Sequence, residues 1–121
     1  MTDNINIKEA WESIQTKLSN QFADGEKMEV DSIVYIIGVQ ELGKGYQKFK
    51  KDEKLELMHI AVCKLLEPYG YYEFDYFDKD GWPHYNLVKE LPFLKGGEQT
   101  VLLKQAIVHY FSEKEVIPNT H

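Results

Sequence analysis

The sequence predicts an α+β fold: a mainly helical single domain of about four helices with one β-hairpin, in the order α-α-α-β-β-α. Apolar residues recur at helical spacing in four segments, and the period changes to two after residue 70. With 121 residues, 43% of them apolar, the chain is long enough for one core and short for two. We therefore expect one domain over residues 1–121, with a frayed tail over 112–121.

The first two helices are expected over residues 7–22 and from Asp31 to Leu42. One apolar face marks the first helix: Ile7, Trp11, Ile14, Leu18 and Phe22. In the second, Asp31 is the expected N-cap and Gly43 the C-terminal glycine. Its β-branched residues would also suit a strand, but the helix formers in "VQELG" favour the helix.

The third helix follows a lysine-rich connector, and Asp52 is its expected N-cap. Its expected apolar stripe consists of Leu55, Met58, Val62, Leu65 and Leu66. Its other faces carry further apolar residues: Leu57, Ile60 and Ala61. This distribution predicts a central, mostly buried helix, which Pro68 and Gly70 end.

Residues 71–88 alternate apolar and polar side chains on both sides of "KDG", which predicts a β-hairpin with Gly81 at positive φ. Pro83 lacks a backbone donor, so its strand is expected to lie at an edge or to begin irregularly there. The last helix is expected over residues 98–112. This order has the outline of a winged-helix module, and an irregular helical domain with a hairpin flap fits it equally well.

Two short motifs match ligand-binding loops in part. Gly38, Gly43 and Lys44 fit G-x-x-x-x-G-K, but Gly45 stands where a phosphate loop needs Ser or Thr, and a helix is expected to end there. The "DKDG" of residues 78–81 fits the middle of a calcium loop, whose first and last ligands would be Tyr76 and Leu87. Two essential ligands are thus missing, and we expect neither nucleotide nor calcium to bind.

Glu56, His59 and Cys63 follow one another at spacings of three and four, as half of a metal site would. The sequence indicates no second half, although His84 and His109 supply further imidazoles. A hydrogen-bonded, partly buried His59 beside a buried thiol is the simpler interpretation. We expect no cofactor, no metal and no enzymatic activity, and keep a metal protein or enzyme centred on His59 and Cys63 as an alternative.

The connector after the second helix carries five lysines: Lys44, Lys48, Lys50, Lys51 and Lys54. With Tyr46 and Phe49 between them, they form an alternative site for nucleic acid, in which the lysines would contact phosphates and the two rings would stack on bases. The overall charge argues against nucleic acid, because all 14 basic residues are lysine and 20 carboxylates give a net charge of −6. The hairpin is acidic as well. DNA phosphates would repel it, which argues against a role as the DNA-contacting wing of a winged-helix module.

The hairpin region is rich in aromatic residues, since eight of the seventeen residues from Tyr69 to Tyr85 are Tyr, Phe or Trp. Strand alternation cannot bury all of these rings on one face, so some are expected outside, where Tyr and Trp act as interface anchors. The expected partner-binding residues are Tyr72, Phe74, Tyr76, Trp82, His84 and Tyr85. The leading hypothesis is a small protein-interaction or self-association domain, and the alternative is that these rings only cover the core.

The sequence predicts a cytoplasmic protein without a membrane anchor. The longest apolar run, Ile33 to Val39, is far shorter than the roughly 20 residues that cross a bilayer. The N-terminal "MTDNINIKEA" lacks the pattern of a signal peptide. Cys63 is the only cysteine and lies among apolar residues, which favours a buried thiol in a reducing compartment.

Overall fold

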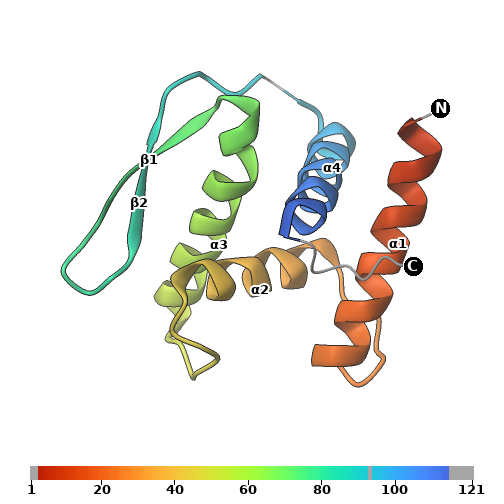
Figure 1. Cartoon of the computed structure of the whole chain (residues 1–121), viewed down its shortest axis with the longest axis horizontal. Coiled ribbons are helices and arrows are strands. Elements are labelled where there is room, and N and C mark those ends of the chain that lie inside the picture. Colours follow the sequence, from red (N-terminus) through yellow and green to blue (C-terminus); the bar gives the residue numbers. More distant parts are fainter. Residues whose placement is uncertain (1–2, 93, 115–121) are drawn as a thin grey trace. The chain divides into compact units, whose positions relative to one another are not determined.

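The computed structural model describes residues 3–92 and 94–114. In order, its elements are α1 (Asp3–Phe22), α2 (Val30–Leu42), α3 (Lys51–Leu66), the 3₁₀ turn η1 (Glu67–Tyr69), β1 (Tyr72–Phe77), β2 (Pro83–Leu87) and α4 (Gly96–Lys114) (Figure 1). The predicted α+β class and the order α-α-α-β-β-α are confirmed. Helix α4 runs to Lys114, slightly beyond its expected end at 112, and residues 115–121 of the expected tail lie outside the described part.

The chain divides into two compact units, and each is described by itself. The first combines Met1–Ile33 with Leu94–His121, and the second is the continuous segment Val34–Phe93. The boundary falls inside α2. That residues 1–121 act as a single domain stays a prediction.

In the first unit, α1 and α4 pack against each other (Figure 1). Trp11 on α1 is buried, and Lys104 Nζ on α4 lies 5.3 Å from the centre of its ring, within the range of a cation–π contact. The chain leaves α1 through Asp24 and Gly25, which have φ angles of 53° and 88°. The left-handed conformation at Gly25 explains why α1 ends before this glycine.

Residues 30–42 form a helix, α2, so the helix that the sequence favours over a strand is confirmed. The expected N-cap at Asp31 is wrong, because the helix already begins at Val30 and Asp31 lies in its first turn, where a carboxylate interacts favourably with the helix dipole. At the other end, the Gly43 N–H donates to the Val39 carbonyl over 3.2 Å, and Gly43 has a φ of 76°. The segment that matches a phosphate loop is therefore the C-terminal end of a helix.

Gly38 marks the place where α2 meets α3 within the second unit. A Cβ atom on Gly38 would lie 2.1 Å from the carbonyl oxygen of Leu57 and 2.7 Å from its carbonyl carbon. Real Cβ contacts are essentially never shorter than 3.0 Å, so only glycine permits this approach of the two backbones. Gly38 is thus a packing residue of a helix crossing.

Helix α3 begins at Lys51, one residue before the expected N-cap Asp52. Glu53 takes the capping role instead, since its Oε1 accepts a hydrogen bond of 2.8 Å from the Lys50 N–H. The predicted apolar stripe is wrong at Leu55, whose side chain is 63% exposed near the start of α3. The buried residues of α3 are instead Leu57, Ile60, Ala61, Cys63, Leu65 and Leu66, which cover a broad side that includes the crossing with α2.

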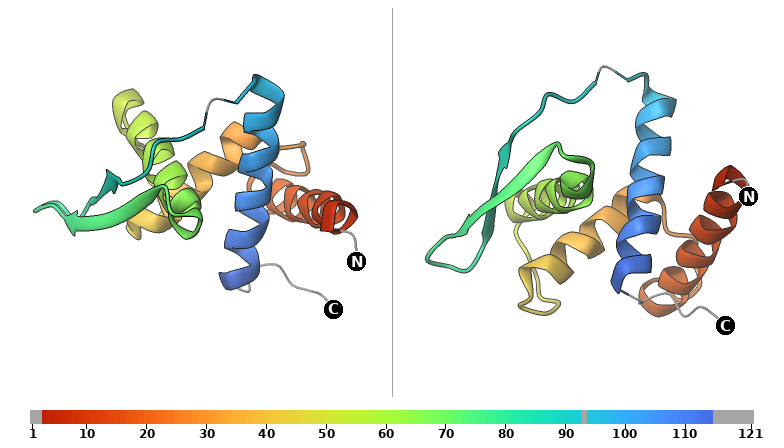
Figure 2. Two further views of the ribbon diagram at one scale, coloured as in Figure 1. Left: turned by 90° about the horizontal axis from the view of Figure 1, so that it is seen from above. Right: turned by 45° about the horizontal axis from the view of Figure 1, so that its top comes forward.

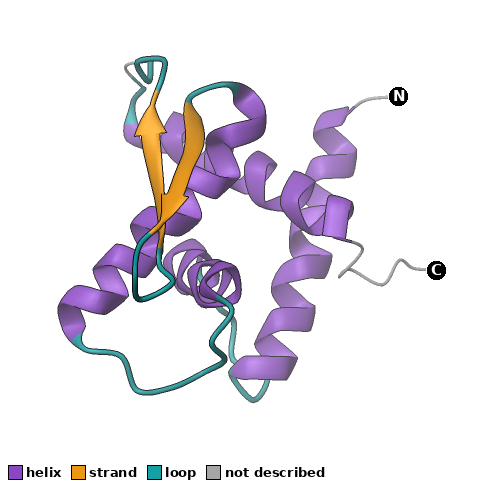
Figure 3. Cartoon of the chain, turned by 60° about the vertical axis from the view of Figure 1, so that its left-hand side comes forward, coloured by secondary structure: helices purple, strands orange, loops and turns teal. Residues whose placement is uncertain are grey.

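The hairpin packs against α3 in the second unit (Figures 1, 2 and 3). Its strands pair antiparallel, with Phe74 opposite Tyr85 and Tyr76 opposite His84, so Asp75 is an extra residue in β1. Strand β2 begins at Pro83, as predicted for a residue without a backbone donor. The irregularity at Asp75 is a β-bulge, and it reverses which side chains face α3 beyond that point.

Candidate functional site

The hairpin turn is held by one carboxylate, that of Asp78. Its Oδ1 accepts hydrogen bonds from the N–H groups of Asp80, at 2.9 Å, and Trp82, at 3.0 Å, while His84 Nε2 lies 2.9 Å from Oδ2. The hydrogen bond with His84, then those with the backbone, lower the pKa of Asp78 from its ordinary value of 3.8. Asp78 therefore holds the hairpin turn in place.

The same turn is braced from outside the hairpin. Gly81 closes it, donating its N–H to the Asp78 carbonyl over 2.9 Å, and has the positive φ that the sequence predicts, 86°. Lys44, which follows α2, donates a hydrogen bond from Nζ to the Asp80 carbonyl oxygen. The tip of the hairpin is thus tied both to itself and to the connector between α2 and α3.

The bulge at Asp75 sorts the aromatic rings of the hairpin onto two faces. On one face Phe74 lies 4.9 Å from Phe77 and 5.8 Å from Tyr85, measured between ring centres. On the other face Tyr76 stacks on His84, with ring centres 4.7 Å apart and planes 4° from parallel. The six sequence-predicted residues therefore do not form one continuous surface.

Trp82 and Tyr72 pack against residues outside the hairpin. Trp82 is partly exposed, as expected, and packs edge to face on the buried Phe49, with ring centres 6.4 Å apart. It covers a small cluster of buried residues: Val39, Leu42, Phe49 and Leu57. Tyr72 lies edge to face with His59 at 6.2 Å, and burial, followed by the charge of Cys63, raises the pKa of Tyr72.

A hollow of about 190 Å³ opens beside the face that carries Phe74. Its lining comes from α2, α3, η1 and both strands: Glu41, Lys64, Glu67, Phe74, Phe77, Pro83 and Tyr85. Sequence reasoning identified Phe74 and Tyr85 here and missed the others, because only the folded second unit brings them together. Phe77 had a signal of its own, an aromatic residue at a strand end, but strict alternation would have turned it away from Phe74.

The pKa of Tyr85 reflects both its burial and the carboxylates around this hollow. Burial raises the pKa of its hydroxyl most, and the carboxylates of Glu67 and Glu41 raise it further. Lys64 Nζ lies 3.5 Å from Glu67 Oε1 at the same place, with both side chains about one-third exposed. The hollow therefore combines aromatic rings with two carboxylates and one ammonium group.

His59 and Cys63 lie together on α3, with Nε2 and Sγ 3.4 Å apart. Cys63 is fully buried, and burial raises the pKa of its thiol to about 11. Such a thiol is protonated at neutral pH and is a poor nucleophile. Within residues 3–92 and 94–114, no three His, Cys, Asp or Glu side chains are placed to hold a metal ion, and His84 pairs with Asp78.

The lysine connector offers less to a nucleic acid than its sequence indicates. Lys48, Lys50, Lys51 and Lys54 are exposed, whereas Lys44 bonds to Asp80. Tyr46 is exposed, but Phe49 is buried in the cluster under Trp82 and presents no free face for stacking. One of the two rings proposed to stack bases is therefore a core residue.

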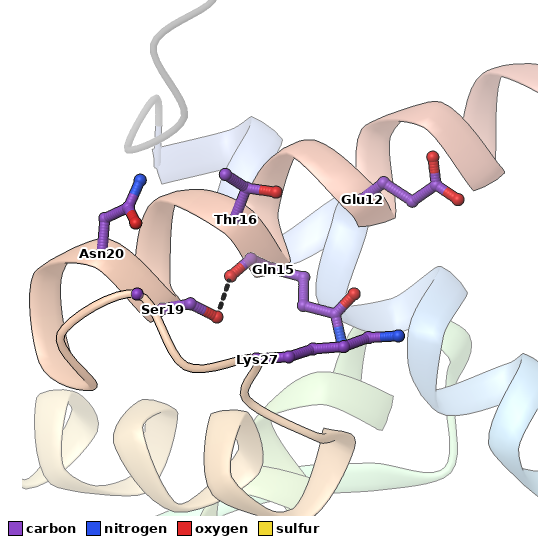
Figure 4. A pocket seen from close by; sticks show the side chains of 7 residues that line it. Glu12, Gln15, Thr16, Ser19, Asn20 and Lys27 are labelled. Carbon is purple, nitrogen blue, oxygen red and sulfur yellow. Dashed lines mark hydrogen bonds between the residues drawn. The ribbon is translucent and has the colours of Figure 1, made fainter.

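The first unit contains a second, polar hollow of about 420 Å³ beside α1 and the loop after it, lined by Glu12, Gln15, Thr16, Ser19, Asn20, Gly25 and Lys27 (Figure 4). Gln15 Nε2 donates to the Met28 carbonyl over 2.7 Å, and Ser19 Oγ accepts from the Met28 N–H over 2.9 Å. Ser19 Oγ also donates to the Gln15 carbonyl (Figure 4). These buried polar groups thus hold the loop that carries Met28.

Among the helices that the structure describes, none has both the length and the apolar content to cross a bilayer. Comparison of the chain with models of known protein families, with curated protein sequences and with solved structures finds no match.

Proposed function

We propose that this protein is a protein-interaction module that binds its partner through the hairpin. The observation that supports this is the exposure of large apolar side chains there: Phe74 is 38% and Phe77 62% exposed, and their ring centres lie 4.9 Å apart on one face of the hairpin. Tyr76 is 50% exposed on the opposite face, and Leu87 and Val88 are exposed at the end of the hairpin. We call the exposed pair Phe74 and Phe77 the hairpin surface. Single exposed apolar residues are common, but adjoining ones on one element are typical of binding sites.

The hairpin surface is built on a braced element, which lowers the cost of binding. Asp78 fixes the turn, Lys44 bonds to its tip, and Tyr76 stacks on His84. Because the rings are already ordered, association immobilises few additional rotors. This property suits Tyr and Phe as anchors, since each contributes a large contact area with few rotatable bonds.

The charge of the hairpin favours a different protein over a second copy of this chain. From Glu67 to Gly81 there are five carboxylates and one lysine, and the whole chain carries a net charge of −6. Two copies that met through this acidic segment would repel each other, whereas a basic partner would be attracted and steered to it. We therefore propose a basic protein partner, and self-association is the competing outcome.

The test compares Phe77→Ala with Leu55→Ala. The two side chains are matched in exposure, 62% and 63%, but Leu55 lies on α3 outside the hairpin surface. Immobilised wild-type protein is used to capture and identify a partner from the source cell, and the affinity of that purified partner is then measured for each variant. We expect Phe77→Ala to weaken binding roughly 10-fold and Leu55→Ala to leave it unchanged.

Circular dichroism and thermal melting of both variants check that the fold is retained. Equal affinity of wild type and Phe77→Ala for the partner would contradict the proposed surface. Sizing chromatography supplies the second criterion. If the wild type is a dimer and Phe77→Ala is a monomer, then the partner is a second copy of this chain and not a different protein.

A further inference from the structure

The hollow beside Phe74 indicates what kind of group the hairpin surface takes from its partner. Its volume of about 190 Å³ is smaller than the roughly 300–1,000 Å³ of pockets that enclose small-molecule ligands. A single amino-acid side chain is the matching size. The hollow also adjoins exposed Phe74 and Phe77, so a partner lying on the hairpin surface can reach it.

The aromatic lining favours a cation. Phe74, Phe77 and Tyr85 contribute ring surfaces, and the faces of such rings attract ammonium and guanidinium groups. An arginine side chain is well suited, because its planar guanidinium group both stacks on rings and donates several hydrogen bonds to carboxylates.

The polar lining favours the same charge. Glu41 and Glu67 bring two carboxylates to the hollow and Lys64 brings one ammonium group, which leaves the lining net negative. Both carboxylates also act on Tyr85, whose raised pKa is the response of a hydroxyl to negative charge nearby as well as to burial. A basic side chain would be attracted to these carboxylates, whereas an anionic side chain would be repelled by them.

Resting on the proposed function, we infer that the hollow lined by Glu41, Glu67, Phe74, Phe77 and Tyr85 receives a basic side chain, preferentially arginine, from the protein partner. The hairpin surface supplies the apolar contact, and the hollow supplies selection for positive charge.

The probe is the capped peptide acetyl-Gly-Arg-Gly-amide, titrated into the full chain and followed by NMR of the aromatic side chains. The control peptide carries citrulline, which has nearly the shape of arginine and no charge. We expect the arginine peptide to shift the ring signals of Phe74, Phe77 and Tyr85 with a Kd on the order of millimolar, as is typical of one isolated contact. The citrulline peptide should bind at least about 5-fold more weakly.

Variants then test the charges. Glu41→Gln and Glu67→Gln should each weaken arginine binding about 3-fold, and Lys64→Met should strengthen it by a similar factor, because it removes a competing cation. Glu73→Gln is the matched control, since it removes the same charge from an exposed position on β1 that does not line the hollow. Equal binding of both peptides, or equal effects of Glu67→Gln and Glu73→Gln, would overturn the inference.

The two proposals fail in different ways. If Phe77→Ala abolishes partner binding but the arginine peptide shifts no ring signal, the hairpin surface stands and the basic occupant is wrong. If the peptide binds as expected but Phe77→Ala leaves partner binding unchanged, the charge preference of the hollow stands and the proposed function is wrong.

Discussion

Replacing Gly38 by alanine should destabilise the protein, although alanine is normally the better helix residue. The added Cβ would lie 2.1 Å from the Leu57 carbonyl oxygen, 0.9 Å short of the 3.0 Å that real contacts require. The obstructing atoms belong to the backbone of α3, so no side-chain rotation relieves the clash. Helices α2 and α3 would have to move apart, which opens the packing around Leu57.

The size of the effect follows from two opposing terms. Overpacking of this kind typically costs about 1–3 kcal/mol, and a rigid backbone obstacle belongs at the upper end of that range. Alanine returns about 1 kcal/mol through its helix propensity. We therefore expect a net loss of about 2 kcal/mol in the free energy of unfolding, which lowers the urea midpoint by about 1 M for a small domain.

The assay uses the two tryptophans of the chain, since Trp11 lies in the first unit and Trp82 in the second. In a Trp11→Phe background, fluorescence reports on the unit that contains the helix crossing. Gly97→Ala, followed by circular dichroism because it lies in the first unit, is the control; this helical glycine has no atom within 4 Å of an added Cβ and should tolerate alanine without loss. A Gly38→Ala midpoint equal to or above that of the parent would refute the close crossing.

Three further predictions concern the hairpin and the buried thiol. Trp82→Ala should cost about 2 kcal/mol of stability by urea unfolding, because the ring covers Phe49 yet is partly exposed; a loss of about 4 kcal/mol or more would make it a full core residue. Asp78 has a lowered pKa in the folded state, so its contribution to stability is present above the ordinary value of 3.8 and lost as the pH falls through the lowered one. The stability difference between wild type and Asp78→Ala should accordingly shrink in that acidic range, and a difference constant down to pH 2 would contradict the bond with His84. The thiol of Cys63 has a pKa of about 11, against an ordinary value of 9.0. It should therefore react with iodoacetamide at pH 8 about 100-fold more slowly in the folded protein than in the urea-unfolded chain. Equal rates would show that the folded thiol is accessible and ionised.

The elements of this fold were predictable because their signals are local. The helical spacing from Ile7 to Phe22, the glycine after Leu42 and the turn at Gly81 each act over a few residues. The caps were less predictable: Asp31 and Asp52 are good N-cap residues, but both helices begin before them. Tertiary packing sets such boundaries, and Leu55 shows the same limit, since the crossing at Gly38 and the hairpin together determine which side of α3 is buried.

The candidate site was predictable only in part. The aromatic content of the hairpin indicated a contact surface, but the bulge at Asp75 has no distinct sequence signature and moves Phe77 to the face of Phe74. Glu41 and Glu67 come from α2 and η1, and periodicity contains no information on which helix end meets which strand face. Phe49 illustrates the reverse case, a ring that its lysine neighbours made look exposed and that is a core residue.

The first unit is made of two segments, and the whole of the second unit lies between them in the chain. During synthesis, α1 leaves the ribosome long before α4, with which it packs. Residues 34–93 need no later segment to complete their own contacts, so we expect them to fold first. Helix α1 can pack only after α4 has been synthesised. In a stalled chain whose residues up to 93 have all left the ribosomal exit tunnel, the hairpin and α3 should therefore resist proteolysis while α1 is cleaved. Protection of α1 at that stage would contradict this order of folding.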